Sequence, residues 1–196
     1  MGDLLRHFLV DFTGGHPLYL HLLCQEISTL CQVHRQSEVF LPLLTQALEN
    51  VVFHPWGVLS RHYDLIIGNL SAGKGNYTTV KLLVALAGGK ESLKKLVSRV
   101  QTRQGLVAQK LNRLMDAGIV SKNGAFFYLR DKVLRYWMKY VFQRRAASMS
   151  PCSGERGASF HEEICEAFNN FKGIAQKQLP ERIMDLLRCF EEEAYL

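Results

Sequence analysis

The stretch Glu91–Leu129, ESLKKLVSRVQTRQGLVAQKLNRLMDAGIVSKNGAFFYL, decides the fold of this chain. Its apolar residues recur three to four positions apart in two successive groups: Leu93, Leu96, Val97 and Val100, then Val107, Leu111, Leu114 and Met115. This spacing predicts two consecutive amphipathic helices. Gly118 stands where the second helix should end, because the C′ position favours a residue that tolerates a left-handed backbone.

A short hairpin is predicted directly after these helices. The strand-like runs 119–122 and 125–129 flank the dipeptide Asn123-Gly124. Asn-Gly between two such runs predicts a type I′ turn, since both central residues of that turn need positive φ.

One more helix, from Tyr77 to Ala87, precedes the stretch, and Ser92 is placed to cap the helix that follows. Three helices followed by a hairpin is the element order of a winged helix. We therefore predict a winged-helix domain with a two-stranded wing over residues 71–145.

The second helix of a helix-turn-helix enters the major groove of DNA, and its exposed residues meet base edges. Lys and Arg pair with guanine, and Gln and Asn pair with adenine. The candidates on this helix are Gln104, Gln109, Lys110, Asn112 and Arg113. Three further cations are placed to contact phosphates: Arg99, Arg103 and Lys122. The same face could instead dock a protein, or be structural only.

The charge of the chain is concentrated in the predicted winged helix. Residues 71–145 contain 16 Lys and Arg but only 3 Asp and Glu, whereas the whole chain has a net charge of +6. Residues 1–70 and 146–196 are each mildly acidic. A surface that binds phosphates requires such a concentration of cations, so double-stranded DNA is the predicted partner and a protein is the alternative.

The remainder of the chain is predicted to be helical, so the fold class is mainly α. Residues 1–70 carry four amphipathic patterns, the fourth of which begins at His54-Pro55, and form an all-helical domain. Residues 146–159 are rich in Ser, Gly and Ala and indicate a linker, and two amphipathic segments near the C-terminus predict a helical hairpin over the rest of 146–196.

Several functional classes are not supported by the sequence. No apolar run is long enough to cross a membrane and no signal peptide is evident, so a cytoplasmic location is expected. The five cysteines lack a CxxC, and the histidines lack ligand spacing, so no metal site is expected. Because no catalytic motif or carboxylate pair is found, the chain is not expected to be an enzyme.

Two segments carry a resemblance to a known family. Phe12–Leu20, FTGGHPLYL, resembles the Gly-x-Pro segment in the helical lid of signal-transduction ATPases of the STAND class, especially the archaeal type. Leu129–Trp137, LRDKVLRYW, resembles the helix that follows the wing in the same family. Within it, Asp131 can cap a helix that begins at Val133. By this resemblance, a helical lid precedes the winged helix, and Gly15, His16 and Pro17 lie beside the adenine of a bound nucleotide. The alternative is a purely structural role, in which Gly-Gly-x-Pro only begins a helix.

The family's P-loop core is absent from this sequence. Gly68–Gly75 is close to a P-loop, but Gly75 follows Lys74 where a Ser or Thr must bind magnesium. The resemblance thus implies a C-terminal portion, or a stand-alone remnant, of a protein whose missing N-terminal core binds ATP or ADP with Mg²⁺. No cofactor and no ATP hydrolysis are expected of this chain itself.

The resemblance also implies a regulatory mechanism. Nucleotide packed on the Gly15–Pro17 segment would hold the winged helix closed, and its release would expose the face that contains Gln109, Lys110 and Arg113. Two alternatives remain: a stand-alone winged-helix transcription regulator that binds DNA, and an adaptor that binds other proteins.

Overall fold

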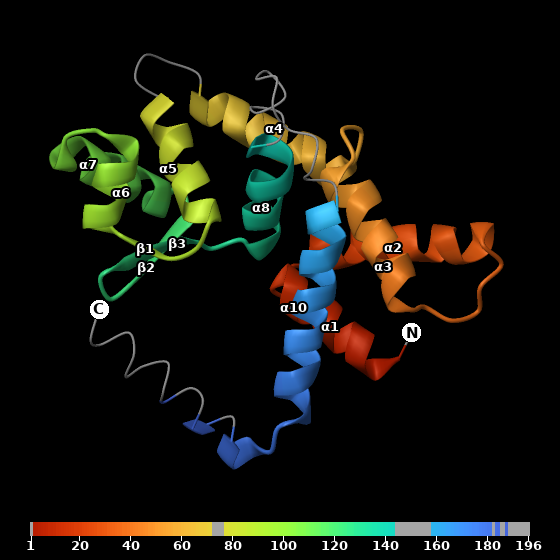
Figure 1. Ribbon diagram of the computed structural model, residues 1–196. Helices are drawn as coiled ribbons and strands as arrows, with labels where there is room; N and C mark the ends of the chain where they lie inside the picture. The colour runs from red at the N-terminus through yellow and green to blue at the C-terminus, as the bar shows by residue number, and fades with distance from the viewer. Residues whose placement is uncertain (1, 72–76, 144–157, 182, 185–186, 188–196) are drawn as a thin grey trace. The chain divides into compact units, whose positions relative to one another are not determined.

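The computed structural model describes residues 2–71, 77–143, 158–181, 183–184 and 187 (Figure 1). The chain divides into two compact units, Met1–Gly154 and Glu155–Leu196. The elements of the first unit are α1 (Asp3–Thr13), α2 (Pro17–Val33), α3 (Leu41–Leu48), the π-helical turn η1 (Glu49–Phe53), α4 (Val58–Ser71), α5 (Tyr77–Ala87), β1 (Glu91–Ser92), α6 (Leu93–Val100), α7 (Gln104–Asp116), β2 (Val120–Asn123), β3 (Phe126–Leu129), α8 (Lys132–Trp137) and a second π-helical turn, η2 (Met138–Phe142). The predicted mainly α fold with a small wing is confirmed.

The stretch Glu91–Leu129 folds as two helices and a hairpin, as expected, with one additional strand. Helices α5, α6 and α7 pack on one another, and the antiparallel sheet has the strand order β1-β3-β2. The wing was predicted to have two strands, but β1 adds a third by pairing Glu91 and Ser92 with Phe127 and Phe126. Two residues are too few to produce an alternating pattern, so this strand could not be predicted from the sequence. We call residues 77–143, the described part of the predicted winged-helix domain, the basic module.

The predicted start of α6 and the predicted end of α7 are each confirmed by the capping residue at that position. The Ser92 hydroxyl accepts a hydrogen bond from the Lys95 amide at the start of α6. Gly118 has a φ of 71°, and its amide and that of Ile119 donate to the Met115 and Leu114 carbonyls. These two bonds form a Schellman motif, which satisfies carbonyls that the end of α7 would leave unpaired.

The hairpin turn lies one residue later than predicted. Asn123 is the last residue of β2 and pairs with Phe126, so Gly124 and Ala125 are the central residues. Gly124 has a φ of 57°, whereas the described backbone gives neither Asn123 nor Ala125 a positive φ. A positive φ at the first central residue alone is the pattern of type II′, so the prediction of type I′ was wrong.

The first four helices follow the predicted pattern, with a correction before α4. Gly14 and Gly15 end α1 through a second Schellman motif, and Pro17 occupies the first turn of α2. The fourth helix was expected to begin at His54-Pro55 but begins at Val58, and Trp56 lies outside it, 78% exposed. The run 65–67 lies inside α4, so no strand precedes the P-loop-like segment, whose residues 72–76 lie outside the described part.

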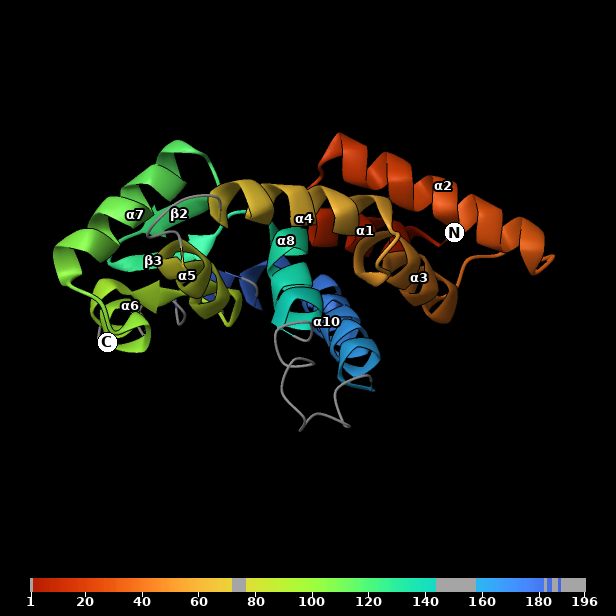
Figure 2. The same ribbon diagram turned by 90° about the horizontal axis from the view of Figure 1, so that it is seen from above.

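Helix α8 lies between the two groups of helices in the first unit. In both views α6 and α7 lie at one end and α2 and α3 at the other, and α4 runs between them (Figure 1 and Figure 2). The Trp137 indole, fully buried, donates from Nε1 to Ser60 Oγ of α4 at 3.1 Å. The rings of Tyr136 and Phe12 lie 4.9 Å apart, which joins α8 to α1.

The second unit contains the helix α10 (Ala158–Gln176) and further helical residues at 179–181, 183–184 and 187. The predicted linker at 146–159 lies almost entirely outside the described residues. Within the described part of the chain, no helix has the length and apolar character needed to cross a membrane.

Candidate functional site

The outer face of α7 presents the residues that were predicted to read DNA bases. Val107, Leu111 and Leu114 turn into the core, which leaves Gln109, Asn112 and Arg113 together on the exposed side. Gln104 is also exposed, at the start of the helix, whereas Lys110 is half-buried on the flank. The regulatory mechanism expects this face to be hidden only while nucleotide is bound, and in this structure Gln109 and Arg113 are accessible.

The three predicted phosphate contacts differ in their surroundings. Arg103 is exposed at the N-cap of α7, and Lys122 is exposed on β2 with its ammonium 5.6 Å from the centre of the Phe127 ring. Arg99 instead forms an ion pair with Glu91, with 2.8 Å between Nη2 and Oε1. Because this guanidinium already has a carboxylate partner, the assignment of Arg99 as a phosphate contact is weakened.

The acidic residues of 77–143 are mostly turned inward. This segment contains three of them: Glu91 is buried against Arg99, Asp131 is half-buried among hydroxyl and amide donors, and Asp116 is exposed. Each of the 13 Lys and Arg residues of the same segment is exposed or half-buried. Inward acids and outward cations make the surface of the module more positive than its composition alone would indicate.

The Gly15–Pro17 segment lines a cavity of about 620 Å³. One wall comes from the α1–α2 connection and the other from the base of the wing and the start of α8: Thr13, Gly14, Gly15, His16, Pro17 and Tyr19 face Gly118, Arg130, Asp131 and Lys132. The cavity falls in the size range of small-molecule sites. Thus the predicted nucleotide-proximal residues lie beside two cations, although Gly14 and Gly15 also serve simply to end α1.

Asp131 is the most highly connected polar side chain at this cavity. Its Oδ1 accepts from the amides of Val133 and Leu134, at 2.8 and 3.1 Å, and so caps α8. Its Oδ2 accepts from the hydroxyls of Tyr19 and Tyr63, at 2.5 and 3.2 Å. Capping was expected at this position, but the two tyrosines lie 112 and 68 residues away and no local pattern indicates them.

Both tyrosines remain hydrogen-bond donors across the neutral range. Burial, followed by the hydrogen bond to the Asp131 carboxylate, raises the pKa of Tyr19 well above its ordinary value of 10. Burial and then the negative charge of Asp131 raise the pKa of Tyr63 further still. On the rim, Lys132 Nζ contacts Asp11 Oδ1 at 3.0 Å, an exposed pair that adds little stability.

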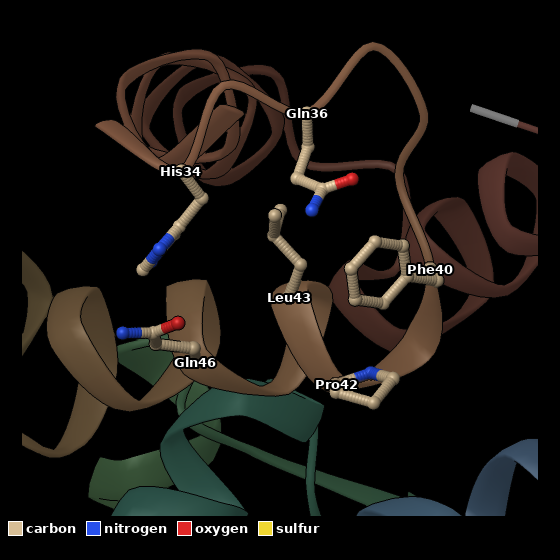
Figure 3. A pocket seen from close by; sticks show the side chains of 6 residues that line it. All are labelled: His34, Gln36, Phe40, Pro42, Leu43 and Gln46. Atoms are coloured by element: carbon tan, nitrogen blue, oxygen red, sulfur yellow. The ribbon is translucent and has the colours of Figure 1, made fainter. Parts of the chain in front are cut away.

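A smaller cavity, of about 270 Å³, lies between the end of α2 and the start of α3. Figure 3 shows the Gln36 amide and the Phe40 ring on one side of Leu43, and the His34 ring and the Gln46 amide on the other. It shares no residue with the predicted sites.

No family model matches this sequence, and no curated protein matches it significantly. Function is therefore inferred from the geometry of the site and from the short motifs quoted above.

Proposed function

We propose that this chain is a regulatory module that binds double-stranded DNA through the basic module and does not itself catalyse a reaction. In this proposal α7 enters the major groove, with Gln109, Asn112 and Arg113 directed toward base edges. Arg103 and Lys122 contact the backbone phosphates on either side.

One observation carries the proposal: the segregation of charge within the module. Of its three acidic residues, Glu91 is buried in an ion pair and Asp131 is half-buried with hydrogen-bond partners, while Asp116 and the cations remain in contact with solvent. Both acids also serve the fold where they lie, and their placement leaves less negative charge on the surface to repel phosphates. The exposed side of α7 adds amide and guanidinium groups suited to adenine and guanine.

The test is fluorescence anisotropy of a labelled DNA duplex at 50 mM salt. We expect Arg103→Ala and Lys122→Ala each to weaken binding by about three- to tenfold, because each removes one phosphate contact. Arg61→Ala removes an exposed cation from α4, outside the basic module, and is the matched control. If Arg61→Ala weakens DNA binding as much as the other two variants, the DNA is attracted by the whole protein and not specifically by the basic module. Absence of binding at low salt would instead favour a protein-docking role.

The second part of the proposal is that the Gly15–Pro17 cavity binds a nucleotide and so regulates DNA binding. Its support is that Gly15, His16 and Pro17 line a cavity of suitable volume together with Arg130 and Lys132. In a full-length parent, ATP or ADP with Mg²⁺ would be held jointly with a P-loop core. Isothermal titration of this chain with ATP, compared with Arg130→Ala, tests the site; equal affinity in both would remove Arg130 from it.

A further inference from the structure

Asp131 joins three helices through its two carboxylate oxygens. Oδ1 caps α8, and Oδ2 accepts hydrogen bonds from Tyr19 of α2 and Tyr63 of α4. The two tyrosine rings meet edge to face at 6.3 Å, and Tyr63 also packs on Trp137 with 5.6 Å between ring centres. The carboxylate is therefore the polar centre of an aromatic cluster that joins the lid helices to α8.

The two tyrosines differ in their access to the cavity. Tyr19 and Asp131 both line it, and the ring of His16 stacks on Tyr19 with 4.2 Å between the centres. Tyr63 is only 1% exposed and is not part of the cavity wall. Because Tyr19 and Asp131 line the cavity and Tyr63 does not, we expect a molecule there to compete for Oδ2 with Tyr19 and not with Tyr63.

The cavity is polar in two different ways. Asp131, half-buried, offers an acceptor on its inner side, whereas Arg130 is exposed and offers positive charge at the rim, where Lys132 is paired with Asp11. A matching ligand has a hydrogen-bond donor such as an amino group at one end and an anionic group at the other.

We propose that the Tyr19–Asp131 hydrogen bond is a latch that such a ligand opens by donating its own hydrogen bond to Asp131 in place of the Tyr19 hydroxyl. This inference rests on the proposed nucleotide site and adds how that site acts on the protein. Opening frees the start of α2 from α8, while Tyr63 and the cap keep α4 and α8 joined. The change therefore arises where the lid helices meet the helix that follows the wing.

A ligand that must displace a hydroxyl binds more weakly than it would without that competitor. Tyr19→Phe removes the competing hydroxyl but keeps the ring and its stacking. Hence it should tighten binding, although it deletes a polar group from the cavity wall. One hydrogen bond of ordinary net strength corresponds to about a fivefold change in Kd. A tyrosine that simply contacted the ligand would give the opposite sign.

The experiment is isothermal titration of the full chain with ATP, adenosine and inorganic tripolyphosphate, in the wild type, Tyr19→Phe and Tyr63→Phe. We expect Tyr19→Phe to tighten ATP and adenosine by about fivefold, and to leave tripolyphosphate, which lacks the amino group, unchanged. Tyr63→Phe, the matched control on the core side, should change no affinity by more than about twofold. Binding of ATP to Tyr19→Phe but not to the wild type would also support the latch.

A second measurement uses the wild type alone and is independent of how the variants fold. With ¹³Cζ-labelled tyrosine, ATP should shift the Tyr19 resonance and leave that of Tyr63 in place. If ATP binds the wild type but Tyr19→Phe weakens that affinity or leaves it unchanged, the latch is wrong and the proposed nucleotide site is retained. If no probe binds either protein, both are wrong. The proposed DNA binding is measured without nucleotide, so none of these outcomes bears on it.

Discussion

The ion pair between Glu91 and Arg99 gives the sharpest prediction about the basic module. Glu91 has a side chain only 10% exposed and lies on β1, whereas Arg99 is 56% exposed on α6. Arg99→Ala would leave the Glu91 carboxylate in a nearly dry place without its charge partner. The variant therefore tests whether this arginine serves the fold or the DNA surface.

The expected loss of unfolding free energy in Arg99→Ala lies between the values for exposed and for fully buried ion pairs. Exposed ion pairs contribute roughly 0.2–1 kcal/mol, whereas breaking a fully buried pair costs about 3–5 kcal/mol. Because water can reach the Arg99 side of the pair, we expect the free energy of unfolding to fall by about 2 kcal/mol. For a unit of this size that lowers Tm by roughly 4–8 °C.

The assay is urea unfolding followed by far-ultraviolet circular dichroism and by tryptophan fluorescence. Adding Glu91→Gln to Arg99→Ala should restore at least half of the loss, since a neutral amide leaves no unpaired buried charge. The exposed Arg103→Ala is the matched control and should change stability by less than about 0.5 kcal/mol. The reasoning is refuted if Arg99→Ala is as stable as the wild type, or if the double variant is no more stable than Arg99→Ala.

Three further predictions concern the scaffold of the site. The raised pKa of Tyr63 gives stability that is fully present below pH 10 and is lost above it, because there the tyrosine ionises in the unfolded chain but not in the folded one. In urea titrations at pH 9–11.5, the advantage of the wild type over Tyr63→Phe should thus shrink by about 1.4 kcal/mol per pH unit above 10, and a constant difference would contradict this. Ser60→Ala should cost roughly 1–3 kcal/mol, since it strands the buried Trp137 N–H; a loss near zero in chemical denaturation would show that the bond is unimportant. Gly118→Ala should lower stability by about 1 kcal/mol, because Gly118 has a φ of 71°. Gly105→Ala, inside α7, should instead raise stability by up to about 1 kcal/mol. Equal effects of the two substitutions on Tm would contradict the assigned backbone geometry.

Local features of the fold could be predicted because their causes are local. Ser92, Gly118 and Asp131 each act within a few residues along the chain, by capping or by allowing a left-handed backbone. The period of apolar residues likewise placed Val107 and Leu111 in the core of the module.

The features that were missed depend on residues distant in sequence or on very short pairings. Tyr19 and Tyr63 meet Asp131 only after the helices have packed, and a buried tyrosine looks in sequence like any apolar position. Arg99 was assigned to phosphate because nothing in its neighbourhood shows that Glu91 will be buried beside it. The hairpin shifted by one residue because a single glycine satisfies a type II′ turn, so the preceding asparagine could join the strand.

The salt dependence of DNA binding tests the central claim most directly. If the outward cations of the basic module neutralise four to six phosphates, log K should fall with log[salt] at a slope of roughly −4 to −5. Affinity for a labelled duplex would then drop more than about a hundredfold between 50 and 200 mM salt. A slope near zero, or one that is unchanged when Arg103 and Lys122 are both replaced by alanine, would contradict the account.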